Sequence, residues 1–288
     1  MKMIKRRFYF YMPKNFFKSL FYYFIIPVLV ILIVLKYSPF ISIILALAYL
    51  GYILYANRVF LYTVLGGLNY SKGNIDKSLD MFSRAYKTGK CKPRTIVSYA
   101  YLLLKSGNVQ KSEELLNSLL DAKIPEDDRM LAKSNLSLAL WKKGDLDGAV
   151  SMLEEVFANY KTTTVYGSLG CLLILKGDLE KALAFNMEAY DYNNSNGIIL
   201  DNLGQTYYMR QEYDKAEEIY EKLMAKSPTF PEAYYNYGLV LLAKNRPVEA
   251  LAMMKKALSF RFSFLSTVTR EEVESKIAET ENMSGQAK

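Results

Sequence analysis

The chain of 288 residues contains no histidine. This absence excludes imidazole metal ligands, serine triads built on histidine, and histidine acid–base chemistry. Cysteine is almost as scarce, because Cys91 and Cys171 are too few for a zinc site or a disulfide framework. No Gly-x-x-x-x-Gly-Lys phosphate-binding loop occurs. We therefore expect no enzymatic activity, no catalytic residue, no cofactor and no metal site.

Acidic residues are missing from residues 1–58, whereas all 29 Asp and Glu side chains lie in the rest of the chain. Residues 1–58 also hold eight of the 37 basic residues, so the remaining 29 are balanced by acids. The formal net charge of +8 therefore belongs to the amino-terminal fifth alone. Because the rest is neutral overall, its charge gives no support to nucleic-acid binding.

Two uncharged, strongly apolar runs occupy residues 19–35 and 40–56, separated by Lys36-Tyr-Ser-Pro39. As helices they are about 24–26 Å long, slightly short of the ~30 Å hydrocarbon core of a bilayer. We predict a two-helix membrane hairpin at residues 19–57. The alternatives are a cleaved signal peptide, a hairpin that dips into one leaflet, and burial of both runs in a soluble core.

Basic residues precede the first apolar run, and this bias places the amino terminus in the cytoplasm. Two spans would return the chain to that side, so we expect a two-span protein of the cell membrane with a cytoplasmic carboxyl-terminal part. Residues 1–18 are basic and aromatic and should lie on anionic lipid head groups. The expected membrane-surface residues are Lys5, Arg6, Arg7, Lys14 and Lys18.

After residue 58 a two-residue turn signature recurs with a period of about 34 residues. It comprises Gly73-Asn74, Gly107-Asn108, Gly144-Asp145 and Gly177-Asp178, followed by the variants Gln211-Glu212 and Asn245-Arg246. A small residue follows five or six positions after each turn position, at Ser78, Ser112, Ala149, Ala182, Ala216 and Ala250. Glycine in a left-handed conformation ends one helix, and Asn or Asp caps the next. This pattern predicts stacked helical hairpins.

Residues 197–228 resemble the tetratricopeptide repeat family. They carry, in the family's order, Leu203-Gly204, Tyr207, Tyr213-Asp-Lys-Ala216, Tyr220 and Pro228. Residues 177–183 and 233–239 are similarly close, although every unit lacks the family's early tryptophan. The first two units have serine in place of the small alanine, and units two and three have Ala100 and Ser137 in place of a glycine.

The resemblance implies an all-α solenoid of about six helix-turn-helix units over residues 58–266. The units are expected near 59–92, 93–126, 130–163, 163–196, 197–230 and 231–264, with Asp121–Arg129 as a polar loop. Thr269-Arg-Glu-Glu272 predicts a capping box that opens a final helix to about Glu279, so residues 267–288 form a capping helix and a frayed tail.

In this family the first helices of the units line a concave groove, and the resemblance carries that role to matching positions here. The expected groove residues are Tyr70, Arg94, Tyr101, Trp141, Asp201, Gln205, Tyr208, Tyr235 and Leu239. The Lys, Arg and Asn cluster with which family members hold a carboxyl-terminal tail is missing. Asn135, Asn202 and Asn236 lie close to the groove and are expected to hydrogen-bond between helices.

The apolar and aromatic groove predicts a membrane-anchored scaffold that binds a helical or extended segment of a protein partner. The alternative is a membrane-associated chaperone or assembly factor for secreted or envelope proteins. Self-association, or filling of the groove by the protein's own termini, would also account for the aromatic residues. Anionic lipid is the second expected partner, and nucleic acid is not expected.

Overall fold

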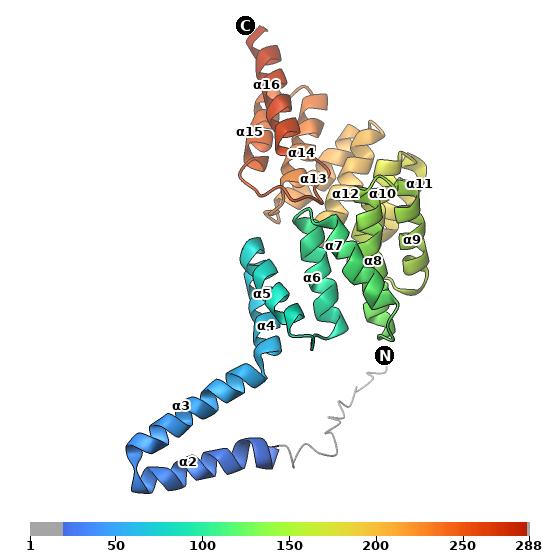
Figure 1. Ribbon diagram of the computed structural model, residues 1–288. Helices are drawn as coiled ribbons and strands as arrows, with labels where there is room; N and C mark the ends of the chain where they lie inside the picture. Colours follow the sequence, from blue (N-terminus) through green and yellow to red (C-terminus); the bar gives the residue numbers. More distant parts are fainter. Residues whose placement is uncertain (1–19, 287–288) are drawn as a thin grey trace, which may run out of the picture. The chain divides into compact units, whose positions relative to one another are not determined.

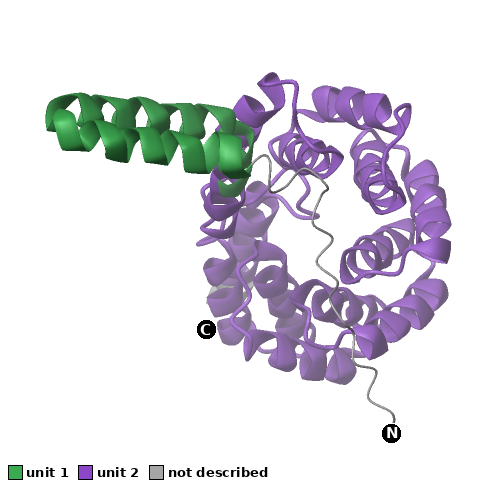
Figure 2. Cartoon of the chain, turned by 90° about the horizontal axis from the view of Figure 1, so that it is seen from below, with its two compact units in different colours: residues 1–64 green, residues 65–288 purple. Residues whose placement is uncertain are grey.

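The computed structural model describes residues 20–286, and every regular element among them is a helix (Figure 1). The predicted all-α class is therefore confirmed for these residues. The chain divides into two compact units, residues 1–64 and 65–288 (Figure 2). The expected membrane-surface residues, Lys5, Arg6, Arg7, Lys14 and Lys18, lie outside the described residues, so their contact with lipid stays a prediction.

The first unit contains a helical hairpin. One π-helical turn, η1 (Phe21–Ile25), leads into α2 (Ile26–Tyr37), and α3 (Pro39–Ala56) runs back beside it. The chain reverses at Ser38, whose backbone is extended. Two side chains then join the helices, because Ser42 Oγ donates to the Ile31 carbonyl at 2.9 Å and the Tyr49 hydroxyl donates to the Tyr23 carbonyl at 2.7 Å.

The two apolar runs differ in their ability to cross a bilayer. Among the described residues, α3 is the only helix that is long and apolar enough, with 18 residues and a mean hydropathy of 1.9. The preceding helical segment, Phe21–Tyr37, is apolar but shorter. Large apolar side chains are exposed along both helices, and Ser42 is the only buried side chain in η1, α2 and α3. The structure thus gives no sign of burial in a soluble core.

The second unit is a stack of helical hairpins followed by a final helix. The six pairs are α4 (Arg58–Ser71) with α5 (Ile75–Lys87), α6 (Pro93–Lys105) with α7 (Val109–Leu120), α8 (Glu126–Lys142) with α9 (Leu146–Asn159), α10 (Thr163–Lys176) with α11 (Leu179–Tyr192), α12 (Gly197–Met209) with α13 (Tyr213–Met224), and α14 (Pro231–Ala243) with α15 (Pro247–Ala257). The last helix is α16 (Arg270–Gln286). Seen from below, the helices of this unit surround a central space (Figure 2).

The turn inside each pair has the predicted left-handed backbone. Its residues have φ between 58° and 95°, and they are Gly73, Gly107, Gly144, Gly177, Gln211 and Asn245. Glycine tolerates this conformation without cost, and the last two positions show that the turn is kept where glycine is replaced. Side-chain caps at Asn108, Asp145 and Asp178 are confirmed, whereas the Asn74 side chain makes no capping bond.

The two helices of a pair meet where the first presents a small residue to a residue 16 positions later. A Cβ atom added to Gly66 would lie 2.7 Å from the ring of Phe82, and one added to Gly204 would lie 2.7 Å from the ring of Tyr220. The second and third helical pairs carry Leu116 and Leu153 at the matching position, opposite Ala100 and Ser137. Both Ala100 and Ser137 are fully buried, so a small side chain other than glycine is accommodated opposite leucine at these two positions.

In the first two helical pairs, a buried serine of the second helix hydrogen-bonds to the first helix. Ser78 Oγ donates to the Gly66 carbonyl and Ser112 Oγ donates to the Ala100 carbonyl, each at 2.8 Å and each fully buried. The small side chain allows the close approach, and its hydroxyl satisfies a helix carbonyl.

Two boundaries differ from the expectation. The predicted loop Asp121–Arg129 ends early, because α8 begins at Glu126 with three acidic residues in its first turn, where negative charge stabilises a helix. The capping box at Thr269 and Glu272 is confirmed, with backbone–side-chain bonds of 2.6 and 3.1 Å. The helix that it opens runs to Gln286, beyond the expected Glu279.

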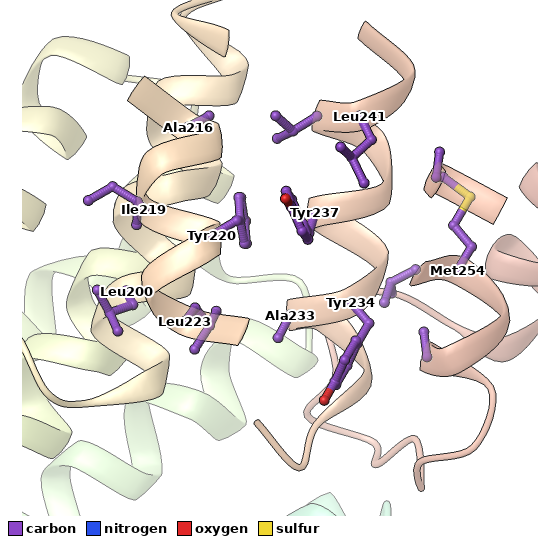
Figure 3. Close-up of a cluster of buried hydrophobic side chains, with 14 of the residues drawn as sticks. Leu200, Ala216, Ile219, Tyr220, Leu223, Ala233, Tyr234, Tyr237, Leu241 and Met254 are labelled. Carbon is purple, nitrogen blue, oxygen red and sulfur yellow. The ribbon is translucent and has the colours of Figure 1, made fainter. Parts of the chain in front are cut away.

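The core continues from pair to pair. In the carboxyl-terminal cluster the rings of Tyr220 on α13 and Tyr237 on α14 stack at 5.6 Å, and Met254 of α15 fills the next layer (Figure 3). Tyr220 and Tyr234 are both buried in this cluster. Each pair thus covers the apolar face of its neighbour, which a single hairpin cannot do for itself.

Candidate functional site

The first helices of the pairs surround an open chamber of about 750 Å³ inside the second unit. Its wall includes residues from α4, α6, α8, α10, α12 and α14, which belong to all six pairs. The superhelical stacking of hairpins directs one face of every first helix to the same space, so residues far apart in sequence share one surface.

Six of the nine expected groove residues line this chamber: Tyr70, Arg94, Tyr101, Trp141, Asp201 and Gln205. The other three, Tyr208, Tyr235 and Leu239, do not line it. They pack against the buried carboxyl-terminal cluster, which includes Val268, Val273 and Ile277 from α16 and the segment before it. The final helix thus covers positions that the sequence places in an open groove.

The amino-terminal end of the chamber is aromatic and basic. The rings of Tyr70 and Tyr101 meet edge to face at 6.4 Å, and Lys105 Nζ lies 5.3 and 5.9 Å from their centres. Arg94 lines the same end and donates to Asp128 at 2.9 Å. Trp141, the single tryptophan of the chain, follows with Lys142 Nζ 3.9 Å from its ring.

The opposite end is acidic. Asp201 on α12 is 7% exposed, and its Oδ1 accepts hydrogen bonds from the Tyr220 hydroxyl at 3.1 Å and from Asn236 Nδ2 at 3.2 Å. Its Oδ2 has no hydrogen-bond partner among residues 20–286, and the residue lines the chamber. Burial raises the pKa of Asp201 to about 7, with Glu232 nearby adding to the increase and the two hydrogen bonds opposing it.

The thiol of Cys171 lies between these ends. Burial chiefly, together with the neighbouring carboxylates of Asp201 and Glu232, raises its pKa to about 12. The thiol therefore stays protonated at neutral pH and fills space rather than acting as a nucleophile.

The asparagines beside the groove join successive pairs, as expected. Asn135 donates to the Val97 carbonyl and Asn202 to the Gly167 carbonyl, at 3.3 and 2.8 Å. Asn236 makes the bond to Asp201 described above. These amides hold neighbouring first helices in register, so their side-chain nitrogens are already used within the fold.

Sequence reasoning missed one element of the site, the segment between α15 and α16. We call residues 259–269 the strap. Its chamber-lining residues are Arg261, Ser263, Leu265, Ser266 and Thr267. The sixth unit was expected to run to residue 264, but its second helix, α15, ends at Ala257, so the strap begins inside the predicted unit as a non-helical segment. The only signal in the sequence is the aromatic run Phe260-Arg-Phe-Ser-Phe264.

The fold and the chamber define a helical-repeat protein with an internal groove. Models of the tetratricopeptide repeat match residues 99–156, 163–196 and 207–261, together about half of the chain. The chain belongs to the tetratricopeptide repeat family, whose members are generally protein-interaction scaffolds.

Relatives of this chain come from bacteria and animals. It is 25% identical over 185 residues to a TPR repeat-containing protein, YvcD, of Bacillus subtilis, which covers 62% of this chain and 37% of that protein. It is 27% identical over 173 residues to the BBSome complex member BBS4 of Bos taurus, covering 60% of this chain and 31% of that one. The chain thus spans about a third of the length of these two relatives.

Two solved structures share the fold. A tetratricopeptide repeat protein from Parabacteroides merdae superposes with a TM-score of 0.60 at 17% identity, covering 83% of this chain and 92% of that one. The Cut9–Hcn1 hetero-tetramer of the APC/C gives a TM-score of 0.61 at 16% identity, covering 91% of this chain and 54% of the other. At this identity the likeness establishes the fold alone.

Proposed function

We propose that the chain is a membrane-tethered adaptor whose chamber binds a segment of a protein partner. The observation that carries this proposal is the chamber itself, a space of about 750 Å³ lined by all six pairs. Its volume lies in the range of pockets that bind ligands. A short extended segment fits such a space better than a helix, whose diameter with side chains is ~10–12 Å.

The polarity of the chamber supports a peptide as ligand. Aromatic rings at Tyr70, Tyr101 and Trp141 offer contact area for apolar side chains. The free oxygen of Asp201 accepts a hydrogen bond from a peptide amide or a cationic group. Lys105 at the other end suits a carbonyl or carboxylate, so a bound segment has one favoured direction.

The membrane tether is supported by the first unit. Its hairpin exposes a continuous apolar surface, of which Leu32, Ile33, Phe40, Ile43 and Leu47 are each at least half exposed. Exposed apolar area of this kind marks contact with lipid or with another protein. The basic residues before the hairpin favour a cytoplasmic amino terminus, and a crossing by Phe21–Tyr37 in addition to α3 would return the repeats to the same side. Confinement to one surface raises the effective concentration of a partner without new contacts.

A photoreactive residue in place of Ile198 tests the chamber. Ile198 lines it and is 42% exposed, whereas Met187 on α11 is 48% exposed and does not line it. We expect the probe at position 198 to yield one dominant protein adduct in cells, and the matched probe at 187 to yield no adduct of that mass, as measured by mass spectrometry.

Other adduct patterns would contradict the adaptor proposal and favour a different function. A broad set of adducts at position 198 would favour a chaperone, and an adduct with a second copy of the chain would favour self-association. Equal patterns at both positions would show that the chamber has no special role.

A reporter fused after Lys288 tests the tether. With two spans we expect a cytoplasmic signal, and deletion of residues 39–56 should move the reporter to the opposite side of the membrane. An external signal from the full chain would mean that one run alone crosses. A signal that deletion leaves unchanged, with the protein in the soluble fraction, would remove the tether altogether.

A further inference from the structure

The strap reaches from the last pair to the first three pairs. Arg261 Nη2 lies 3.3 Å from Asp76 Oδ1 on α5, and the Phe264 amide donates to the Lys105 carbonyl at 3.1 Å. The Phe264 ring lies over Gly107, since a Cβ atom added there would be 3.5 Å from it. Leu265 packs against the buried cluster of the first three pairs.

The strap then turns back toward α16. The Ser266 amide donates to the Ser263 carbonyl at 2.9 Å, which forms the turn. Lys142 Nζ donates to the Ser266 carbonyl at 3.1 Å, and the Thr267 amide donates to Glu232 Oε1 at 3.3 Å. The tip, residues 264–267, is therefore bound through its backbone by groups from α6, α8 and α14.

These contacts are those expected of a bound peptide. In a bound extended peptide, hydrogen bonds to backbone amides and carbonyls fix the peptide backbone. The adjacent aromatic and aliphatic side chains, Phe264 and Leu265, pack against apolar residues of the repeats. Lys142 also lies 5.4 Å from the Phe264 ring, within reach of a cation–π contact. Burial lowers the pKa of the Lys142 ammonium, so an acceptor such as the Ser266 carbonyl offsets its desolvation.

The hold on the tip is limited. Phe264 stays 43% exposed, and the Arg261–Asp76 ion pair lies at the surface, where such pairs contribute about 0–1 kcal/mol. Segments with few buried contacts open locally at low cost. The ends of the strap are firmer, because Phe260 stacks on Tyr234 at 5.1 Å and Val268 is buried.

We propose that the strap occupies part of the chamber and competes there with a segment of a partner protein that has similar side chains. That segment is an extended stretch with an aromatic residue followed by an aliphatic one and a hydroxyl residue, as in Phe264-Leu-Ser266. The proposal rests on the proposed function and narrows its ligand. If the strap is closed in a ratio of 10:1, external affinity falls about tenfold.

A synthetic peptide tests this competition. The probe is residues 258–268, Leu-Ser-Phe-Arg-Phe-Ser-Phe-Leu-Ser-Thr-Val, blocked at both ends, added to the full chain in a mild detergent. Trp141 is the only tryptophan and lines the groove, so its fluorescence reports binding directly. We expect Phe264→Ala with Leu265→Ala in the protein to bind the peptide at least tenfold more tightly than the unchanged chain.

Controls separate the strap from general loosening. Phe262→Ala alters the strap outside the tip, where the Phe262 ring lies 5.2 Å from the guanidinium of Arg270. This variant should bind the peptide with the same affinity as the unchanged chain. A peptide carrying both alanines should not bind any variant. Leu265→Ala alone should give an intermediate affinity, which serves as the readout if the double variant loses helicity by circular dichroism.

Two outcomes would overturn the inference. Equal affinity of the unchanged chain and the strap variants would show that the strap does not compete. Failure of the peptide to bind any strap variant, with a dominant adduct still formed from position 198, would mean that the groove binds a partner of other chemistry. Loss of that adduct as well would place the failure in the proposed function itself.

Discussion

Asp201→Asn should stabilise the protein at pH 8 and flatten its stability profile between about pH 4 and 7. The carboxyl of Asp201 has a folded-state pKa of about 7, raised chiefly by burial. An unfolded aspartate titrates near 3.9, so between these values the folded chain holds a proton that the unfolded chain has lost. The free energy of unfolding contributed by this group therefore falls as pH rises through that window.

The size of the effect follows from the two pKa values. A full difference from about 3.9 to about 7 corresponds to on the order of 4 kcal/mol. Asparagine keeps the side-chain oxygen that accepts from Tyr220 and Asn236 but cannot ionise. The measurement is urea unfolding of the full chain in detergent, followed by circular dichroism at pH 5 and pH 8.

The exposed carboxylate of Asp191 provides the matched control. Asp191→Asn should change the unfolding midpoint little at either pH, since surface substitutions usually stay within about 0.5 kcal/mol. Identical pH profiles for the unchanged chain and Asp201→Asn would show that Asp201 is not desolvated in the folded state.

Gly66→Ala and Phe82→Leu should each destabilise the protein alone and compensate each other when combined. The new methyl group would lie 2.7 Å from the Phe82 ring, and overpacking of this kind costs about 1–3 kcal/mol. With leucine at position 82 the clash is removed, and alanine then gains about 1 kcal/mol of helix propensity over glycine. The second pair already carries this combination naturally, as Ala100 opposite Leu116.

A double-mutant cycle measures the coupling, for which we expect about 1–3 kcal/mol in urea unfolding. The adjacent glycine of α4 supplies the control, because a Cβ atom added to Gly67 has nothing within 4 Å. Gly67→Ala should therefore stabilise, in either background, by about 0.5–1 kcal/mol. Strict additivity of Gly66→Ala and Phe82→Leu would contradict the steric explanation.

Local chemistry accounts for the part of the fold that could be predicted. The helix-ending turns were predictable because a left-handed residue and a capping side chain lie within a few positions of each other. Gln211 and Asn245 have the same backbone without glycine, and only their place in the repeat identified them. The small residues from Ser78 to Ala250 were predictable for the same reason, and all six are fully buried.

The parts that could not be predicted depend on distant contacts. Tyr208, Tyr235 and Leu239 occupy groove positions of their units, but the repeat pattern does not show that the final helix covers them. The strap occupies residues that the repeat pattern assigns in part to the end of the sixth unit, and two of its partners, Lys142 and Asp76, precede it by more than 100 residues. In the first unit, hydropathy predicts two equal spans, whereas helix length distinguishes α3 from the segment before it.

The strap also changes how the stack behaves as a folding unit. Each hairpin of a solenoid contacts only its neighbours, so such proteins fray from either end. Here Arg261 meets Asp76 across 185 positions, and Lys142 meets Ser266 across 124. The strap thereby connects the end of the repeat array to its beginning. While the strap is closed, fraying at one end of the array also breaks strap contacts at the other end, so the closed array is more cooperative, and slower to form, than an open row of the same hairpins.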